Sequence, residues 1–308
     1  MKKSGIPFLL LVLVLSFPGS GPALADEVTI RSDEQFRLGQ EAMQRGEYQR
    51  AVTELERFLH FFPDDELVPR VRYLIGLCYL QAKQYDKARE VFNDLRKAYA
   101  GKLLEGEALF MIGESYYRQG LYSEAEKHFR PLSEESPIPE IRNRAAYRLG
   151  WCRMKGDRWK DGSETFRKVD PASPLYPSAR HLTEKSLEGM ALPSKEPATA
   201  GALSALVPGL GHVYCERYKD GLVAFLLNGL FIWAAYESFH EDREVLGGIL
   251  GFLELGWYSG SIYSAVNSAH KYNRAQKEGF LRNLRDDLDV GLFTTREGHV
   301  GMALQVRF

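Results

Sequence analysis

The chain has few cysteines, and their positions do not favour disulfides. Only three occur among 308 residues: Cys78, Cys152 and Cys215. A disulfide needs Cα atoms within about 7 Å of each other, and these three cysteines lie in widely separated parts of the sequence. We therefore expect all three to be small buried hydrophobic side chains.

The sequence also lacks an excess of charge of one sign. It has 40 lysines and arginines against 41 aspartates and glutamates, so the formal net charge is −1. A protein that binds nucleic acid needs a basic face. Nucleic acid is therefore not expected as a partner.

Catalytic and metal-binding motifs are weak. The seven histidines are scattered singly, and the segment HEDRE at 240–244 lacks the second histidine of a zinc helix. Ser268 and Lys271 match S-x-x-K, but no partner motif accompanies the pair. We expect no enzyme activity, no cofactor and no metal. An enzyme of unrecognised type is the remote alternative, which a cleft joining Ser268, Lys271 and His270 to a base would favour.

What the sequence does contain is an internal repeat of 37 residues. Its first marker is a glycine, at Gly39, Gly76, Gly113 and Gly150. An aromatic, a small and a bulky apolar residue follow each glycine at fixed intervals. They are Tyr48, Tyr85, Tyr122 and Trp159; Ala51, Ala88, Ala125 and Gly162; and Leu55, Phe92, Phe129 and Phe166. Small residues facing small residues predict two closely packed antiparallel helices per unit.

These units resemble tetratricopeptide repeats over roughly residues 33 to 170. The resemblance is plainest in LGQEAMQRGEYQRAVTELERFLHFFP and IGESYYRQGLYSEAEKHFRPLSEESP. Lys83 and Asp157 depart from the pattern by replacing the turn glycine found at Gly46 and Gly120. The period exceeds the family's usual 34 residues, and this spacing is similar to that of tetratricopeptide proteins in bacterial cell envelopes.

The resemblance implies an α-solenoid of about four helix pairs. A last repeat has no neighbour to cover its apolar face, so we expect a capping helix at about 177–190. The solenoid with its cap would occupy 33–190, and a proline-containing linker would follow at 191–200.

Family registration also implies a concave, partner-binding groove lined by the first helix of each repeat. It places one aromatic ladder, a second ladder beside it, and amide and basic groups at the rim. These are Phe36, Tyr73, Phe110 and Tyr147; Met43, Leu80, Tyr117 and Met154; and Gln44, Gln81, Arg118 and Lys155. Such a surface would suit an extended peptide or a helix with acidic residues. The alternative is that the aromatic positions are part of the scaffold.

The start of the chain has the pattern of a secretory signal. Lys2 and Lys3 precede the apolar run PFLLLVLVLSF, and 23–25 is a small-x-small cleavage site. Residues 1–25 are therefore predicted to be a signal peptide, with an uncleaved anchor as the alternative. No cysteine follows the cleavage site, so a lipid anchor is not expected.

Beyond the linker the sequence becomes apolar enough for lipid. Segments 221–239 and 245–266 approach the length that a bilayer requires. They predict a transmembrane helical hairpin within a membrane module at 201–285, although buried helices of a globular domain are the alternative. The module opens with the turn Pro208-Gly209-Leu210-Gly211 and resembles small bacterial membrane modules that begin with a Pro-Gly-x-Gly turn.

The charge pattern leaves two topologies open. The tail 270–285 is basic and the turn 240–244 is acidic, so the positive-inside rule places the tail in the cytoplasm. With exported repeats this needs three crossings, which the charge pattern favours slightly. Two crossings with a re-entrant first segment are the alternative.

Two polar residues fall inside the predicted hairpin. Asn228 and Glu254 are expected at similar depth, about 15 to 18 Å from the turn, where they could hydrogen-bond to each other. A carboxyl group inside a membrane suggests a proton or ion relay. The alternative is a neutral Glu254 paired with Asn228 or a tyrosine hydroxyl.

The last segment, 286–308, is predicted to be a β-hairpin because apolar residues alternate from Val300 to Phe308. A terminal phenylalanine strand resembles the C-terminal signal of outer-membrane barrels, but one hairpin cannot close a barrel. We expect the hairpin to pack on its own domain or at an interface.

The expected fold class is therefore all-α: a tetratricopeptide-like solenoid, a transmembrane helical hairpin and a short C-terminal β-hairpin. The expected function is a membrane-anchored scaffold of the bacterial cell envelope. Its repeats would be periplasmic and would bind a protein or peptide partner, with the inner membrane favoured over the outer and the oligomeric state open. The alternative is a transport or ion-conducting module regulated by its repeats, for which Glu254 is the discriminating residue.

Overall fold

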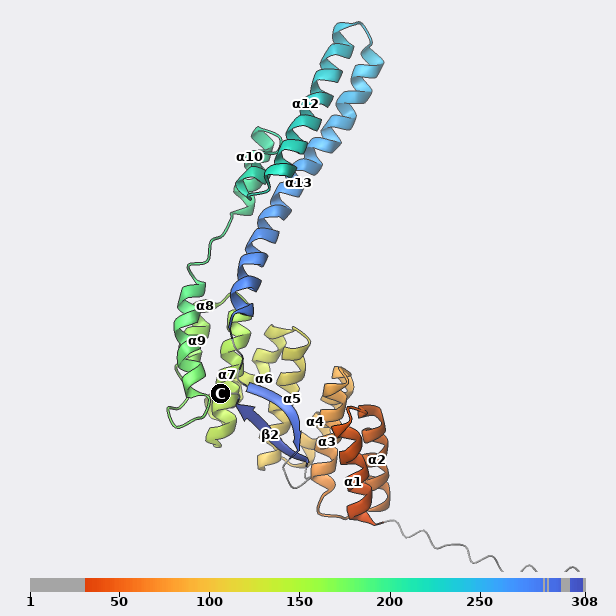
Figure 1. Ribbon diagram of the computed structural model, residues 1–308, viewed down its shortest axis with the longest axis vertical. Coiled ribbons are helices and arrows are strands. Elements are labelled where there is room, and N and C mark those ends of the chain that lie inside the picture. Colours follow the sequence, from red (N-terminus) through yellow and green to blue (C-terminus); the bar gives the residue numbers. More distant parts are fainter. Residues whose placement is uncertain (1–30, 285, 287, 295–299, 307–308) are drawn as a thin grey trace, which may run out of the picture.

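The computed structural model describes residues 31–284, 286, 288–294 and 300–306. Within these ranges the chain forms thirteen helices and two short strands (Figure 1). The predicted signal peptide at 1–25 lies outside the described residues.

Helices α1 to α8 form four antiparallel pairs that stack in chain order (Figure 1). Their bounds are α1 Ser32–Gln44, α2 Tyr48–Phe61, α3 Val68–Gln81, α4 Tyr85–Ala98, α5 Leu103–Arg118, α6 Tyr122–Glu135, α7 Pro139–Lys155 and α8 Trp159–Phe166. A further helix, α9 (Tyr176–Gly189), packs against α8 and buries Ala179 and Leu182. One continuous apolar core runs through all nine helices. We call these nine helices, α1 to α9, the solenoid.

The repeated glycine accommodates the repeated apolar side chain of the second helix in each pair. A Cβ atom added to Gly113 would lie 2.7 Å from the ring of Phe129, closer than side-chain atoms pack. The missing side chain therefore lets the two helices approach. The same relationship holds for Gly39 with Leu55, Gly76 with Phe92, and Gly150 with Phe166.

In every repeat, the turn between the two helices has a residue with left-handed backbone conformation at the same position. Gly46 and Gly120 have φ values of 74° and 80°, and Lys83 and Asp157 have 58° and 63°. Non-glycine residues pay roughly 1–2 kcal/mol for this conformation. The turn geometry is therefore imposed by the packing of the helices and not by the residue in the turn.

The second half of the chain is a helical hairpin with two short helices at its base. These are α10 (Pro197–Leu206), α11 (Leu210–Tyr214), α12 (Tyr218–His240) and α13 (Glu244–Arg282). Helices α12 and α13 pack side by side and project away from the solenoid (Figure 1). We call this pair the apolar hairpin.

The turn between α10 and α11 depends on two glycines. Gly209 has a φ of 85°, and a Cβ atom there would lie 2.1 Å from the carbonyl oxygen of Gly221. A Cβ atom on Gly211 would lie 2.0 Å from the carbonyl oxygen of Ala200. Both glycines therefore permit close backbone contact at the base of the apolar hairpin.

Small and polar residues at seven-residue intervals form the contact between α12 and α13. The buried residues at this interval are Gly221, Asn228 and Ala235 on α12, and Gly247, Glu254, Ser261 and Ser268 on α13; Ser238, Ala265 and Ala269 are also buried. A seven-residue interval is typical of helices that pair with a left-handed twist. Small residues at such a seam allow the helix axes to come close.

Helix α13 is much longer than the predicted span at 245–266. It runs for 39 residues, and its last turns reach the solenoid. The ring of Phe280 packs edge-on against Trp159 with centroids 5.7 Å apart, and Lys277 Nζ lies 2.8 Å from Asp157 Oδ2. The hairpin and the solenoid are therefore joined by direct contacts as well as by the 191–200 segment.

The expected fold class is wrong in its last component. The described helices define an all-helical, tetratricopeptide-like solenoid, and a C-terminal β-hairpin is not part of that class. The extended backbones of β1 (Leu288–Thr294) and β2 (Val300–Val306) pair with each other in antiparallel register, but no further strand joins them among the described residues. Two strands alone are marginally stable and add no sheet layer to the fold.

Candidate functional site

The aromatic ladder expected to line the groove is buried in the core. Phe110 and Tyr147 are 0% exposed, Tyr73 is 3% and Phe36 is 9%. Three of these rings pack on the phenylalanine of the second helix in the same pair, and Phe36 packs on Phe58. This corrects the expectation of an accessible ladder. Each residue lies three positions before the repeated glycine and therefore shares its core-facing side.

The second ladder is likewise internal. Met43, Leu80 and Met154 are at most 2% exposed and belong to the apolar core. Tyr117 is also buried, but its hydroxyl donates a hydrogen bond to Asp286 Oδ2 at 3.3 Å. Tyr117 is thus the one member of this ladder whose polar atom bonds to the segment that follows α13.

Two of the expected rim residues, Arg118 and Gln81, connect neighbouring repeats. Arg118 Nη1 donates to Gln81 Oε1 at 3.2 Å, and Arg118 Nε donates to Glu114 Oε1 at 3.0 Å. Both side chains are partly buried. Amide and basic groups therefore brace the inner face of the solenoid, which the first helices of the repeats form.

At the centre of this face lies a buried ion pair that the sequence analysis missed. Arg148 on α7 donates to both oxygens of Glu114 on α5, at 2.7 and 3.3 Å. The side chains of Arg148 and Glu114 are only 3% and 1% exposed. The signal for Arg148 in the sequence is weak, because the same register holds Arg37, Leu74 and Met111 in the earlier repeats, so that a charge at this position does not recur from one repeat to the next.

The other side of the Arg148 guanidinium holds Asp286. Arg148 Nη1 donates to Asp286 Oδ2 at 2.6 Å, so Asp286 receives hydrogen bonds from α5 and α7 together. Burial by itself would lower the pKa of Arg148, but the carboxylates of Glu114 and Asp286 raise it well above its ordinary value. Burial raises the pKa of Tyr117, which keeps its hydroxyl a donor. We call Tyr117, Arg148 and Glu114 the carboxylate site.

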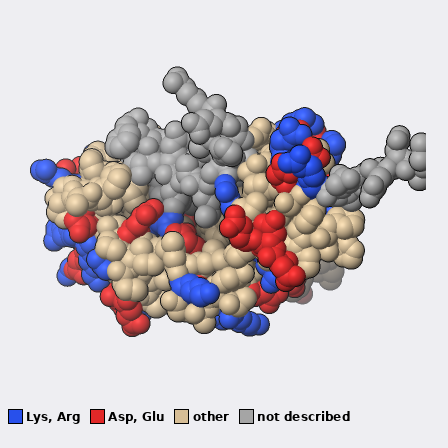
Figure 2. Space-filling view, turned by 90° about the horizontal axis from the view of Figure 1, so that it is seen from below, with Lys and Arg blue, Asp and Glu red and all other residues tan. Residues whose placement is uncertain are grey.

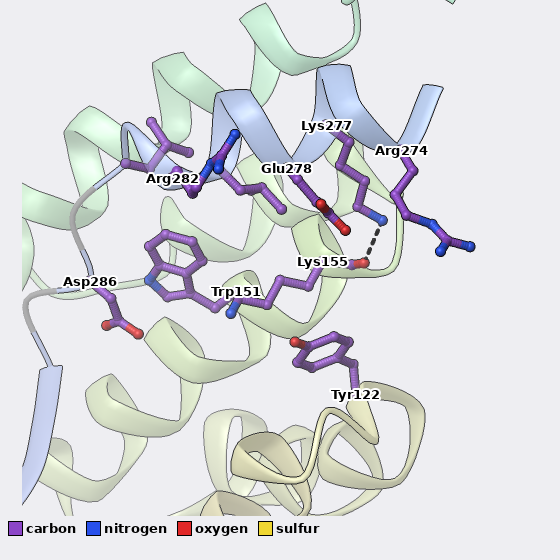
Figure 3. Close-up of a pocket in the computed structure, with 10 residues that line it drawn as sticks. Tyr122, Trp151, Lys155, Arg274, Lys277, Glu278, Arg282 and Asp286 are labelled. Carbon is purple, nitrogen blue, oxygen red and sulfur yellow. Dashed lines mark hydrogen bonds between the residues drawn. The ribbon is translucent and has the colours of Figure 1, made fainter. Parts of the chain in front are cut away.

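A pocket of about 550 Å³ lies beside the carboxylate site, between the solenoid and the end of α13 (Figure 3). Its lining is Tyr122, Trp151, Lys155, Arg274, Lys277, Glu278, Leu281, Arg282, Leu284 and Asp286. The Lys155 ammonium lies 5.0 to 5.8 Å from the ring centroids of Tyr117, Tyr122 and Trp151. Burial lowers its pKa. The pocket therefore combines apolar walls with a surplus of basic groups.

The surface of the solenoid seen from below carries intermixed charges. On the described part of that face, Figure 2 shows basic and acidic groups interspersed, in keeping with the near-zero net charge of the chain. The described part of this face therefore carries no broad basic field.

The two polar residues of the apolar hairpin do not bond to each other as expected. Asn228 Nδ2 donates to the carbonyl oxygen of Ala224 at 2.6 Å. Asn228 Oδ1 and both carboxyl oxygens of Glu254 are buried without a hydrogen-bond partner among the described residues. Glu254 is therefore an unsatisfied polar group inside the helix pair.

Two helices, α12 and α13, are long and apolar enough to cross a bilayer. Little of their most apolar stretches is covered by protein, 11% in α12 and 17% in α13. Large side chains such as Leu226, Trp233 and Phe252 are more than half exposed. Core helices of soluble proteins are mostly buried, so this exposure needs an explanation.

The three cysteines are free and buried, as predicted. Burial raises the pKa of the Cys78 and Cys152 thiols to about 12. Both thiols therefore remain protonated and unreactive at neutral pH.

Comparison with known proteins identifies the repeats. A tetratricopeptide repeat family model matches residues 36–102 and 110–177, so the predicted tetratricopeptide repeats are confirmed for this part of the chain. Repeats of this kind are generally non-catalytic scaffolds for protein–protein interaction. No curated protein sequence matches the chain.

Several solved structures are similar in fold at low sequence identity. A tetratricopeptide repeat protein from Parabacteroides merdae is 11% identical with a TM-score of 0.41, covering 78% of this chain and 98% of its own. The pilF protein of Pseudomonas aeruginosa is 16% identical with a TM-score of 0.36, covering 79% and 97%. MamA from Desulfovibrio magneticus RS-1 is 17% identical with a TM-score of 0.38, covering 63% and 91%. At these scores the three structures give no information on the partner of this chain.

Proposed function

We propose that the protein is a membrane-anchored adaptor of the bacterial cell envelope whose solenoid recruits a protein partner. The apolar hairpin would lie in the bilayer, and the solenoid would stand in the periplasm after removal of residues 1–25. The observation that carries the proposal is the uncovered apolar surface of α12 and α13. Exposed apolar surface of this extent marks a membrane or protein contact, and both helices have the length of a span.

The contact between α13 and the solenoid supports two crossings instead of three. Lys277 pairs with Asp157, and a bilayer cannot separate two residues in contact. The positive-inside rule used the basic residues of 270–285 to place the tail in the cytoplasm. The structure gives one of them, Lys277, a different role, because it binds the tail to the solenoid. With two crossings, the turn between α12 and α13 would lie on the opposite side of the membrane.

Membrane anchoring is tested by extraction of membranes from cells that express the full chain. Alkaline carbonate should leave the protein in the pellet, and detergent should release it. A variant with Leu226→Lys and Phe252→Lys changes two exposed hairpin residues and should shift protein to the soluble or degraded fraction. Lys83→Glu, on an exposed solenoid turn, is the matched control and should behave as wild type. Release of the wild type by carbonate would contradict the proposal.

Partner recruitment is tested by photo-crosslinking in intact cells, followed by separation of inner and outer membranes. A photoreactive residue at Gln81, on the inner face, should capture a discrete partner. The same residue at Glu56, on an exposed part of α2, is the control for random contact. Equal capture from both positions would contradict a partner site on the inner face.

One observation favours a second function, an ion or proton pathway through the apolar hairpin. The Glu254 carboxyl group is buried and has no hydrogen-bond partner among the described residues. An ionisable group inside a membrane costs free energy, and such groups commonly mark ion or proton pathways. Glu254→Gln keeps the shape and removes the titratable proton. Loss of a proton-dependent flux in reconstituted vesicles would support this function, whereas unchanged flux would leave Glu254 a structural residue.

A further inference from the structure

The inner face of the solenoid is already occupied by the chain's own C-terminal segment. Asp286, four residues after the end of α13, bonds to Arg148 on α7 and Tyr117 on α5. Strand β1 then contacts α1, so the segment crosses from the fourth repeat to the first (Figure 1). The chain's own segment therefore contacts the inner face, which an adaptor would offer to a partner, at the fourth and third repeats and again at the first.

The carboxylate site is built to receive an acidic group from outside the solenoid. The guanidinium of Arg148 is 3% exposed and is held from behind by Glu114, which Arg118 also contacts. The guanidinium groups of Arg118 and Arg148 thus share the single carboxylate of Glu114, and Asp286 supplies a second carboxylate to Arg148. Hydrogen bonds between ionised partners are roughly twice as strong as neutral ones. A site fixed in this way selects a carboxylate.

The receptor groups and their occupant differ in accessibility. The Asp286 side chain is 31% exposed, while Arg148 and Glu114 are buried within the solenoid. Leu284, two residues earlier, packs against the solenoid core and lines the adjacent pocket. The tail therefore presents an apolar residue, Leu284, and an acidic residue, Asp286, two positions apart. Because Arg148 and Glu114 belong to the solenoid itself, the tail can leave while the solenoid keeps its fold.

We propose that an extended acidic segment of the protein partner binds the carboxylate site in place of Asp286, so that the chain's own tail competes with the partner. This inference rests on the proposed adaptor function and adds the chemistry of the partner. The partner segment places an apolar side chain in the pocket beside the carboxylate site and a carboxylate on Arg148 and Tyr117. The tail keeps the inner face closed until such a segment displaces it.

The test uses full-length protein in detergent micelles and a fluorescent peptide, NLRDDLDVGLFT, which copies residues 283–294. Wild-type protein and the Asp286→Asn variant are compared by fluorescence anisotropy. In the variant the resident carboxylate is gone, so the peptide should bind at least about tenfold more tightly than to wild type, since a charged hydrogen bond contributes about 1.5–3 kcal/mol. A peptide with all three aspartates changed to asparagine should lose that affinity.

Two controls locate the effect. Glu188→Gln removes an exposed carboxylate that pairs with Lys185 on α9 and changes neither the carboxylate site nor the pocket beside it, so this variant should bind the peptide as wild type does. Tyr117→Phe combined with Asp286→Asn should weaken binding several-fold, because one donor to the carboxylate is lost. Unchanged helical content by circular dichroism shows that each variant is folded, and should Asp286→Asn fail this check, Asp286→Ser replaces it.

Equal peptide affinity for wild type and the Asp286→Asn variant would overturn the inference, as would equal affinity for the acidic and asparagine peptides. The result is independent of the adaptor test. If the peptide binds the purified protein as predicted but no partner is crosslinked in cells, the adaptor function alone is rejected. A crosslinked partner without the predicted peptide binding would reject the carboxylate site alone.

Discussion

Arg118 and Gln81 stand one repeat period apart and are joined by a hydrogen bond of 3.2 Å across the inner face of the solenoid. Arg118 also contacts Glu114, which holds Arg148 of the next repeat. A chain of polar contacts thus links the second, third and fourth repeats and ends at Asp286. The same side chains that brace the repeats also form the carboxylate site.

Removal of Glu114 should destabilise the solenoid strongly. Glu114→Ala would leave Arg148 buried without the carboxylate that holds it, and breaking a buried pair costs about 3–5 kcal/mol. Glu124→Ala is the matched control, since its pair with Lys127 is exposed and is worth at most about 1 kcal/mol. Denaturant unfolding of both variants measures the difference. A loss for Glu114→Ala no larger than for Glu124→Ala would contradict the assigned network.

Replacement of a repeated glycine should weaken the contact between paired helices. Gly113→Ala places a Cβ atom 2.7 Å from Phe129, and overpacking of a core typically costs about 1–3 kcal/mol. Gly279→Ala is the control, because nothing lies within 4 Å of its added Cβ atom and alanine favours a helix. The thermal midpoint should fall for Gly113→Ala and hold or rise for Gly279→Ala. A rise in both would show that the Gly113 contact is not tight.

A glycine at the strained turn of the second repeat should stabilise the protein. Lys83 has a φ of 58°, and Lys83→Gly removes the steric cost of that conformation, with an expected gain of about 0.5–1 kcal/mol after the added flexibility of the unfolded chain. Asp157→Gly relieves the same strain at the fourth repeat but deletes the contact with Lys277. It should therefore gain less. A loss of stability for Lys83→Gly in unfolding experiments would argue against the turn strain, and a larger gain for Asp157→Gly would argue against a stabilising contact with Lys277.

Acid should weaken the solenoid through Glu126. Burial alone would raise the pKa of this carboxyl, but hydrogen bonds from Arg158 and Arg130 and the charge of Arg153 hold it at about 2 against an ordinary 4.5. A carboxyl with a depressed pKa in the folded state stabilises the fold above pH 4.5, and this contribution disappears as pH falls from 4.5 toward 2. Because the Arg130 and Arg158 side chains are about half exposed, solvent screens the interaction, and the expected loss is on the order of 1 kcal/mol.

The control for this pH effect is Glu126→Gln. Across the same acid range, the free energy of unfolding of the variant should depend less on pH than that of wild type, because the variant has one titrating group fewer. Parallel pH profiles for the two proteins would show that Glu126 does not carry the effect.

The repeats were predictable because their determinants recur. The glycine at position 113 and the phenylalanine at 129 have counterparts in the other repeats, and a recurring small-to-large contact has few structural solutions. The burial of Phe110 was harder to predict, because a 37-residue period does not distinguish a core side from a groove side. Only the three-residue offset from Gly113 does so.

The carboxylate site could not be predicted in the same way. Glu114 and Arg148 have no charged counterparts at the same register in every repeat, and Asp286 comes from a segment far along the chain. The contact of Asp286 with Arg148 depends on α13 continuing past the apolar stretch and packing on Trp159. Such a long-range contact leaves no periodic trace in the sequence.

The central claim, that the apolar hairpin crosses a membrane with the solenoid and the tail on one side, is tested most directly by thiol labelling. Single cysteines replace Asp242, at the hairpin turn, and Lys83, on the solenoid, in a background whose native cysteines are buried. In sealed spheroplasts a membrane-impermeant maleimide should label the Lys83→Cys protein at once and the Asp242→Cys protein only after permeabilisation. Labelling of both positions from the outside would contradict the account.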